Sequence, residues 1–204
     1  MDEYFPLRKS SLSVEEAKVC LRWLAHFHAR FMNTEPKGLW STGTYWHLET
    51  RPDELKVMED NALKEHTFLI DEHLNNCKYK TIVHGDAKVA NFCFSEDMKD
   101  VAAVDFQYVG GGCGMKDVVY FLGSCLLEDD IKNHDLLLLD YYFETLKEAL
   151  NQYHPYLVSS KIEQEWRAMY AIAWTDFTRF LMGWMPTHQK ITCLLYTSPS
   201  PRDA

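Results

Sequence analysis

The sequence lacks most features that mark metal-binding, secreted or membrane-spanning proteins. Its six cysteines form no C-x-x-C pair and no spacing typical of a zinc site, which favours reduced thiols. The first residues, Met1-Asp-Glu-Tyr-Phe-Pro, contain neither the basic nor the apolar region of a signal peptide. The longest apolar run, Val118 to Leu127, is about half the length that spans a bilayer. We therefore expect a cytoplasmic protein with no membrane span.

Basic residues are also scarce. Lys and Arg number 21 against 30 Asp and Glu, so the formal net charge is −9. A broad nucleic-acid-binding surface is not expected at this charge, and a bound nucleotide would need local help, most simply from a divalent cation. What is present is a globular composition, with 47% hydrophobic and 14% aromatic residues in 204 positions. This is enough for one domain with a sizeable core.

Helical spacing dominates the first part of the chain. Ser13-Val-Glu-Glu16 is a capping box, and the apolar positions after it predict a helix that ends near Met32. The breakers in residues 33–52 predict a long loop. Asp53 is expected to cap a second helix, whose apolar face would extend to Leu74.

The spacing then changes to short apolar runs. Residues 80–83, 92–94 and 101–104 are predicted strands, and the polar segment between the last two favours a hairpin. The glycine-rich residues 109–114 are predicted to form a flexible loop. Asp117 is placed to cap the helix that follows.

Two apolar stripes predict long helices in the remainder. One runs from Leu136 to Leu150 and the other from Trp166 to Trp184. The aromatic residues of the second stripe are expected in the core, with a cation–π cage for a ligand as the alternative; they are Trp166, Tyr170, Trp174 and Trp184. Glu165 and Asp176 are expected on a solvated helix face. Residues 191–204 follow neither period and resemble a translated sequencing adapter, so they are interpreted as a non-native tail.

The strongest chemical signal is His84-Gly-Asp86 with Asn91 five positions after Asp86, followed by an apolar strand that ends at Asp105. A carboxylate such as Asp86 can orient an attacking hydroxyl or accept its proton. Asn91 and Asp105 offer the oxygen ligands that suit Mg²⁺. Lys88 could neutralise phosphate charge. The alternative is that Asp and Asn simply cap turns, which is common for each alone.

These residues carry a resemblance to a known family. The chain resembles the C-terminal lobe of the aminoglycoside phosphotransferase and choline kinase superfamily, and its ecdysteroid-kinase-like branch is nearest. The matching sequence segments are residues 82–94, 101–108 and 112–122. Weaker similarity extends the match to about residues 10–190.

The resemblance implies an α+β fold, a protein-kinase-like C-terminal lobe over residues 1–190. That lobe would be mostly helical, with a small β-hairpin carrying the catalytic and metal-binding loops. By resemblance, Asp86 is the catalytic base, Asn91 and Asp105 bind Mg²⁺, and His84 and Asp117 support the catalytic loop. The implied reaction transfers the γ-phosphate of ATP to a hydroxyl group of a small molecule.

One departure from the family affects the functional prediction. The family's N-terminal lobe holds a sheet, a nucleotide-covering loop and a phosphate-binding Lys, and no Gly-rich strand-turn-strand precedes His84 here. Lys88 cannot replace that strand lysine, and the chain is interpreted as a fragment. Two alternatives therefore stay open: a catalytically silent, kinase-derived module that binds a ligand or a protein, and, more distantly, a Mg²⁺-independent hydrolase.

Overall fold

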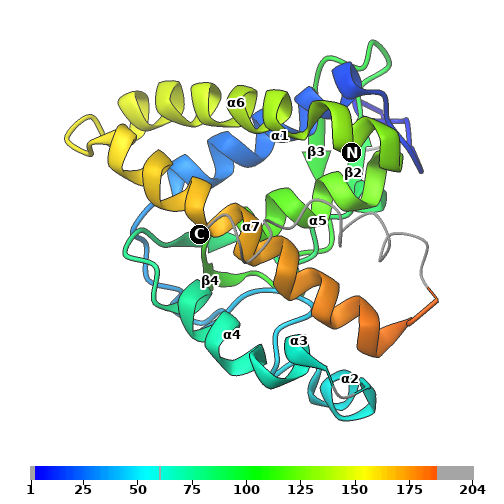
Figure 1. Cartoon of the computed structure of the whole chain (residues 1–204). Coiled ribbons are helices and arrows are strands. Elements are labelled where there is room, and N and C mark those ends of the chain that lie inside the picture. The colour runs from blue at the N-terminus through cyan, green and yellow to red at the C-terminus, as the bar shows by residue number, and fades with distance from the viewer. Residues whose placement is uncertain (1–2, 60, 188–204) are drawn as a thin grey trace.

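The computed structural model describes residues 3–59 and 61–187 (Figure 1). The predicted tail at 191–204 lies outside these residues. The four longest helices of the described chain are α1 (Val14–Arg30), α5 (Met115–Cys125), α6 (Glu128–Tyr153) and α7 (Ser159–Trp184). Figure 1 shows α1 and α6 side by side, while α7 runs diagonally toward the short helices α2–α4. None of the described helices is long and apolar enough to cross a membrane.

The start of α1 is fixed by the capping box that the sequence predicts. The Ser13 Oγ accepts the backbone N–H of Glu16 at 3.3 Å, and the Ser13 N–H donates to the Glu16 carboxylate at 2.8 Å. Two of the N–H groups that a helix start leaves unpaired are thereby satisfied. The prediction for this helix is confirmed.

The single helix predicted from Asp53 to Leu74 is wrong. The structure has three short helices there, α2 (Pro52–Val57), α3 (Ala62–Glu65) and α4 (Thr67–Asn75). Met58 is extended and ends α2, while the Asn61 side chain accepts the Lys64 N–H at 3.0 Å and starts α3. Asn favours such capping over a helix interior. Asp53 is not a cap, because it follows Pro52 within the first turn of α2.

The strands form two separate antiparallel pairs. β2 (Phe92–Phe94) and β3 (Val101–Ala103) make the predicted hairpin. β1 (Thr81–Val83) pairs with β4 (Gly110–Gly112), so the prediction of a flexible glycine-rich loop is wrong. A glycine is needed at position 110 because another segment lies directly against the strand: a Cβ on Gly110 would come within 2.8 Å of the Gly43 backbone.

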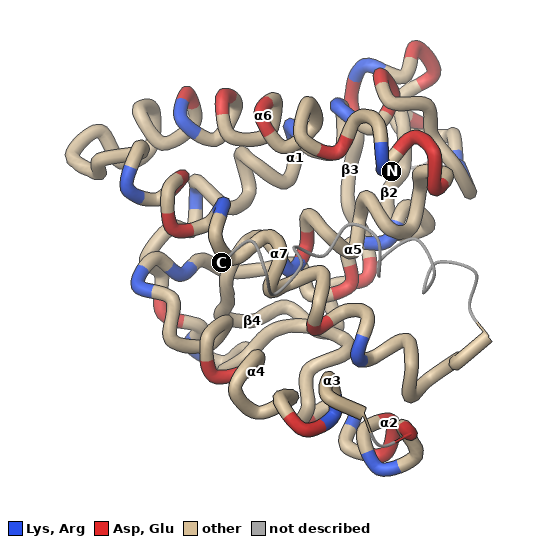
Figure 2. Tube along the Cα trace, viewed as in Figure 1, with Lys and Arg blue, Asp and Glu red and all other residues tan. Residues whose placement is uncertain are grey.

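The two predicted apolar stripes form much of the core. Buried positions of α6 and α7 include Leu139, Phe143, Leu146, Leu150, Trp166, Tyr170, Ala173, Trp174, Phe177 and Leu181. The ends of the stripes depart from the prediction, since Leu136 is 65% exposed and Trp184 is 47% exposed. Both acidic and basic residues lie along α6 and α2, as Figure 2 shows.

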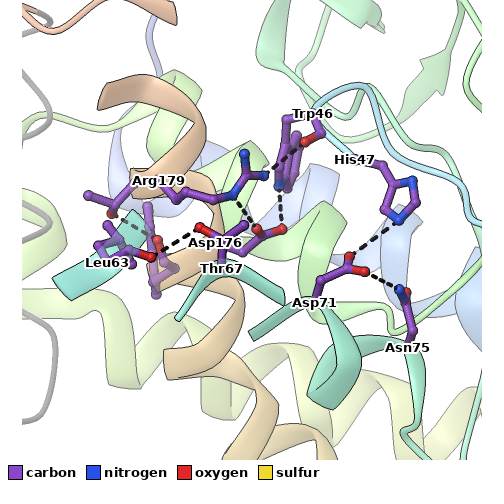
Figure 3. A network of polar contacts seen from close by, with 10 residues as sticks. Trp46, His47, Leu63, Thr67, Asp71, Asn75, Asp176 and Arg179 are labelled. Atoms are coloured by element: carbon purple, nitrogen blue, oxygen red, sulfur yellow. Dashed lines mark hydrogen bonds and ion pairs between the residues drawn. The ribbon is translucent and has the colours of Figure 1, made fainter. Parts of the chain in front are cut away.

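A buried ion pair ties the loop before α2 to α7 (Figure 3). Arg179 Nε donates to Asp176 Oδ1 at 2.9 Å, Trp46 Nε1 donates to Asp176 Oδ2 at 3.1 Å, and Arg179 Nη2 donates to the Trp46 carbonyl at 3.0 Å. Asp176 is 2% exposed, so its predicted place on a solvated face is wrong. Paired in this way the buried charges are tolerated. The same loop contacts the site described next, because the Tyr45 N–H donates to the Gly85 carbonyl at 2.7 Å.

Candidate active site

The site is built on the segment from His84 to Asn91, which joins β1 to β2. It is here called the catalytic loop, after the role that the sequence predicts for it. Its turn requires a glycine at position 85, where φ is +81°. A Cβ on Gly85 would also collide with the Tyr108 carbonyl. The loop ends in a short 3-10 turn, η1 (Val89–Asn91), which leads directly into β2.

Asp86 lies at the centre of the loop and is 1% exposed. Its Oδ2 accepts the Asn91 Nδ2 and the Lys88 Nζ, both at 2.9 Å. Its Oδ1 is buried and has no hydrogen-bond partner among the described residues. A buried oxygen without a partner is costly in a purely structural loop and suits a site that receives a hydroxyl donor.

Asn91 holds Asp86 through its side-chain amide. The Nδ2 donates to both the Asp86 carbonyl, at 2.7 Å, and the Asp86 carboxylate. This orientation leaves the Asn91 Oδ1 as an available oxygen ligand. The Asn91 backbone carbonyl accepts the Val104 N–H at 2.9 Å, which sets the end of β3 beside the loop.

Asp105 follows directly after that contact. Its φ of +64° lies in the left-handed region, which Asp tolerates better than most side chains and which is enriched at functional sites. The side chain is exposed and forms no hydrogen bond or ion pair with another described residue. The structure thus brings Asp86, Lys88 and Asn91 into direct contact and places Asp105 next to them through the backbone, with its carboxylate free for a ligand.

Asp117 connects α5 to the catalytic loop. It does not cap α5 as predicted: Gly114 is the N-cap residue, and the Asp117 carboxylate instead accepts the backbone N–H groups of His84, at 2.6 Å, and Gly85, at 2.9 Å. His28 Nε2 lies 3.0 Å from the same carboxylate. Burial would raise the pKa of Asp117, but the contacts with His28, then His84 and Gly85, outweigh it and lower the pKa.

His84 links the loop to β3. Its Nε2 donates to the Val104 carbonyl at 2.9 Å, and its Nδ1 accepts the Asp86 N–H at 3.2 Å. Both ring nitrogens are therefore engaged with backbone groups. His28, expected to be a satisfied core histidine, is indeed buried between Asp117 and the Tyr142 hydroxyl, which lies 2.7 Å from its Nδ1.

Two hollows flank the site residues. A pocket of about 320 Å³ borders Lys88 and is mostly aromatic, with a lining that includes Tyr45, Tyr120, Ser124, Phe177, Phe180 and Trp184. A more open hollow of about 630 Å³ begins beside Asp105 and is lined by Leu39, Trp40, Phe106 and Gln107, among others. Of the aromatic residues considered for a cation–π cage, only Trp184 reaches the first pocket; Trp166, Tyr170 and Trp174 belong to the core.

Tyr120 is the site residue that the sequence did not reveal. It lies one turn after Asp117 on α5, packs edge-on against Trp46 and at a tilt against Phe177, and lines the aromatic pocket. Burial raises the pKa of the Tyr120 hydroxyl, and the neighbouring Asp86 carboxylate raises it further. The phenol therefore remains a neutral donor next to Asp86. Tyr120 lies three residues after Asp117, so both are on the same face of α5. This spacing is the one sequence signal that could have indicated Tyr120 as a site residue.

The residues fit a magnesium ion by donor type. No group of three or more His, Cys, Asp or Glu side chains within residues 3–59 and 61–187 is arranged to hold a metal. Mg²⁺ commonly takes only one or two protein oxygens and completes its shell with water and phosphate. The Asn91 Oδ1 is not used by the contacts of the Asn91 amide. The Asp105 carboxylate has no partner among the described residues. Both groups are oxygens of this kind.

Comparison with known proteins places these residues within a recognised sequence family. A model of the ecdysteroid kinase-like family matches residues 40–154, a range that holds the catalytic loop, Asp105, Asp117 and Tyr120. Neither the curated proteins nor the solved structures that were searched gave a match.

Proposed function

The chain belongs to the ecdysteroid kinase-like family, and from this premise we propose that it transfers the γ-phosphate of ATP to a hydroxyl group of a small molecule. The observation that carries the proposal is the hydrogen bonding and burial of the two Asp86 carboxylate oxygens. One of its oxygens is held by Asn91 and Lys88, while the other is buried without a hydrogen bond of ordinary geometry. The carboxylate neighbours the Tyr120 hydroxyl, and Tyr120 and Lys88 line an aromatic pocket. A carboxylate held in this way is suited to receive the proton of an incoming alcohol.

The reaction needs alignment and charge neutralisation more than covalent help from the protein. Asp86 would orient the acceptor hydroxyl and take its proton as the phosphoryl group transfers. Lys88, whose side chain is 39% exposed, can move between the Asp86 carboxylate and a phosphate oxygen. Asn91 and Asp105 would hold Mg²⁺, which neutralises charge on the phosphates when bound.

The aromatic pocket is proposed as the acceptor site. Phe177, Phe180 and Trp184 give it an apolar wall, and the Tyr120 hydroxyl and Lys88 mark the polar end nearest Asp86. Such a pocket favours a lipophilic alcohol whose hydroxyl reaches Asp86. The open hollow beside Asp105 is proposed as the nucleotide side, where Trp40 and Phe106 offer flat apolar surface.

The direct test is phosphate transfer by the purified chain. The protein is incubated with Mg²⁺ and γ-labelled ATP and with a panel of hydrophobic, amino and sugar alcohols, and labelled product is separated by chromatography. Product formation from at least one alcohol supports the proposal. Mg²⁺–ATP binding by calorimetry without product from any alcohol would instead support the silent binding module.

Asp105→Asn is expected to weaken the magnesium dependence of both nucleotide binding and transfer. The substitution removes a charge from the metal site while keeping its shape, so the Mg²⁺ concentration for half-maximal effect should rise about tenfold or more, in line with the loss of a supporting metal contact. A titration of ATP binding against Mg²⁺ measures this. Asp129→Asn, an exposed acid in the first turn of α6, is the charge-matched control. An identical titration for Asp105→Asn and the wild type would exclude metal binding by Asp105.

Tyr120→Phe is expected to lower kcat/KM for the alcohol by about two- to tenfold, the value of one ordinary hydrogen bond. The ring contacts with Trp46 and Phe177 remain, so the free energy of unfolding should be nearly unchanged. Steady-state kinetics with varied alcohol and saturating ATP provide the measurement. Tyr156→Phe, at a residue that is 96% exposed, serves as the control. Unaltered kinetics would remove the Tyr120 hydroxyl from the acceptor site.

A further inference from the structure

Two cysteines distant in sequence meet at one end of the β1–β4 pair. The register pairs Thr81 with Gly112, which are the first residue of β1 and the last of β4. Cys77 lies four residues before Thr81, and Cys113 directly follows Gly112, so both lie beyond the same end of the two strands. This region is on the far side of β1 from the catalytic loop, which begins after Val83.

The two thiols are neighbours. Each influences the pKa of the other, and the Cys77 thiol donates a hydrogen bond to the Tyr79 carbonyl at 3.4 Å. Both cysteines are free, and the fully buried Cys113 also interacts with the backbone N–H of Met115. Glu165 of α7 fixes the segment between the two by accepting the N–H groups of Lys78 and Tyr79.

Solvent can reach one member of the pair. Cys77 is 4% exposed and lies at the edge of a hollow of about 390 Å³, together with His73, Asn76, Glu165 and Met169. Cys113 lies behind it and is inaccessible. A small oxidant would therefore meet Cys77 first and leave Cys113 positioned to react second, which is the arrangement of a reactive and a resolving thiol.

The electrostatic surroundings favour the same order of events. The Cys113 thiol has the largest influence on Cys77 and lowers its pKa, while burial raises the pKa of Cys113. The ammonium group of Lys116 is buried without a hydrogen-bond partner among the described residues. Its positive charge lowers the pKa of both cysteines and so favours their thiolate forms.

We propose that Cys77 and Cys113 form a reversible disulfide when the folded protein meets a peroxide. The Cys77 thiolate attacks one peroxide oxygen, the O–O bond breaks, hydroxide leaves and Cys77 becomes a sulfenic acid. The Cys113 sulfur then attacks the Cys77 sulfur, the S–O bond breaks, and the S–S bond forms. In total, the two thiols lose two electrons and two protons, and hydrogen peroxide becomes two molecules of water.

The other described cysteines do not offer this arrangement. Cys20 and Cys125 are both buried, and burial raises the pKa of Cys20 far above its ordinary value. Cys93 is buried in β2 and contacts no other thiol within the described part of the chain. The inference is independent of the proposed phosphate transfer, since it requires neither ATP nor an alcohol.

Mass spectrometry of the folded full chain tests the proposal. The protein is treated with hydrogen peroxide at near-equimolar amounts, its remaining thiols are blocked with iodoacetamide, and it is digested without reductant. We expect one linked peptide pair containing Cys77 and Cys113, a loss of two titratable thiols per chain, and full recovery with dithiothreitol. Cys77→Ala and Cys113→Ala should each abolish the link, and Cys93→Ala should leave it unchanged.

The wild-type protein alone decides the outcome if a variant fails to fold. Peptides showing Cys77 as sulfinic acid with Cys113 still a free thiol would overturn the proposal. So would a link that appears only in denaturant, because the folded arrangement would then play no part. Circular dichroism before and after oxidation establishes which state was treated.

Discussion

Asp86→Asn is expected to lower kcat for phosphate transfer by about 10²- to 10⁴-fold, the usual contribution of a positioned general base. The amide has the same shape as the carboxylate and can still accept the Asn91 Nδ2, so the catalytic loop should keep its conformation. It cannot take a proton from the acceptor hydroxyl, and it loses the ion pair with Lys88. Initial rates with saturating Mg²⁺–ATP and the best alcohol from the panel provide the measurement.

The control for Asp86→Asn separates chemistry from folding. Asp100→Asn removes an acid that is 76% exposed from the β2–β3 turn and should retain wild-type kcat. Mg²⁺–ATP affinity should change much less than kcat, because Asn91 and Asp105 are untouched. Turnover by Asp86→Asn at the wild-type rate would take Asp86 out of the reaction.

Asp117→Asn is expected to reduce the free energy of unfolding by about 3 kcal/mol or more, as for other buried charged groups that lose their partners. Asp117 is 1% exposed and accepts two backbone N–H groups and His28. An amide must turn its NH₂ group toward one of these donors and leave it unsatisfied. Urea unfolding followed by tryptophan fluorescence measures the loss.

The pH dependence gives an independent readout for Asp117. Because the pKa of this carboxyl is lower in the folded than in the unfolded chain, its contribution is complete above the unfolded pKa of about 4 and disappears as pH falls through the folded pKa. The variant should therefore lose less stability than the wild type below about pH 4. Asp130→Asn, in the first turn of α6, is the matched control and should unfold as the wild type does. Equal stability of Asp117→Asn and the wild type would exclude this acid as a support of the loop.

Much of the site could be read from the sequence because its central contacts are local. Asp86 and Asn91 are five residues apart in one turn, and the hairpin that follows carries Asp105 into place. Their proposed roles in transfer and metal binding stay predictions. The interpretation of the chain as a fragment also stays a prediction. Before β1, the only β pairings among the described residues are single bridges at Leu7 and Trp40.

The errors occur where a distant segment decides the local structure. Gly110–Gly112 has the composition of a loop, yet it forms a buried strand because Thr81–Val83 offers its hydrogen bonds. At Gly110 the Gly43 backbone also leaves no room for a side chain. Asp117 is at a position typical of a cap, but its carboxylate is drawn to two unpaired N–H groups of the catalytic loop. In both cases the competing partner is far away in the sequence.

The sequence by itself determined the kinase-like motif, the long helices and the hairpin, since each depends on spacing within a few residues along the chain. Tertiary structure alone decided that Tyr120 neighbours Asp86, that Asp176 is buried with Arg179, and that Cys77 neighbours Cys113. The physical reason is that periodicity specifies which face of an element is apolar, but only the packing of whole elements fixes which polar atoms come within bonding distance.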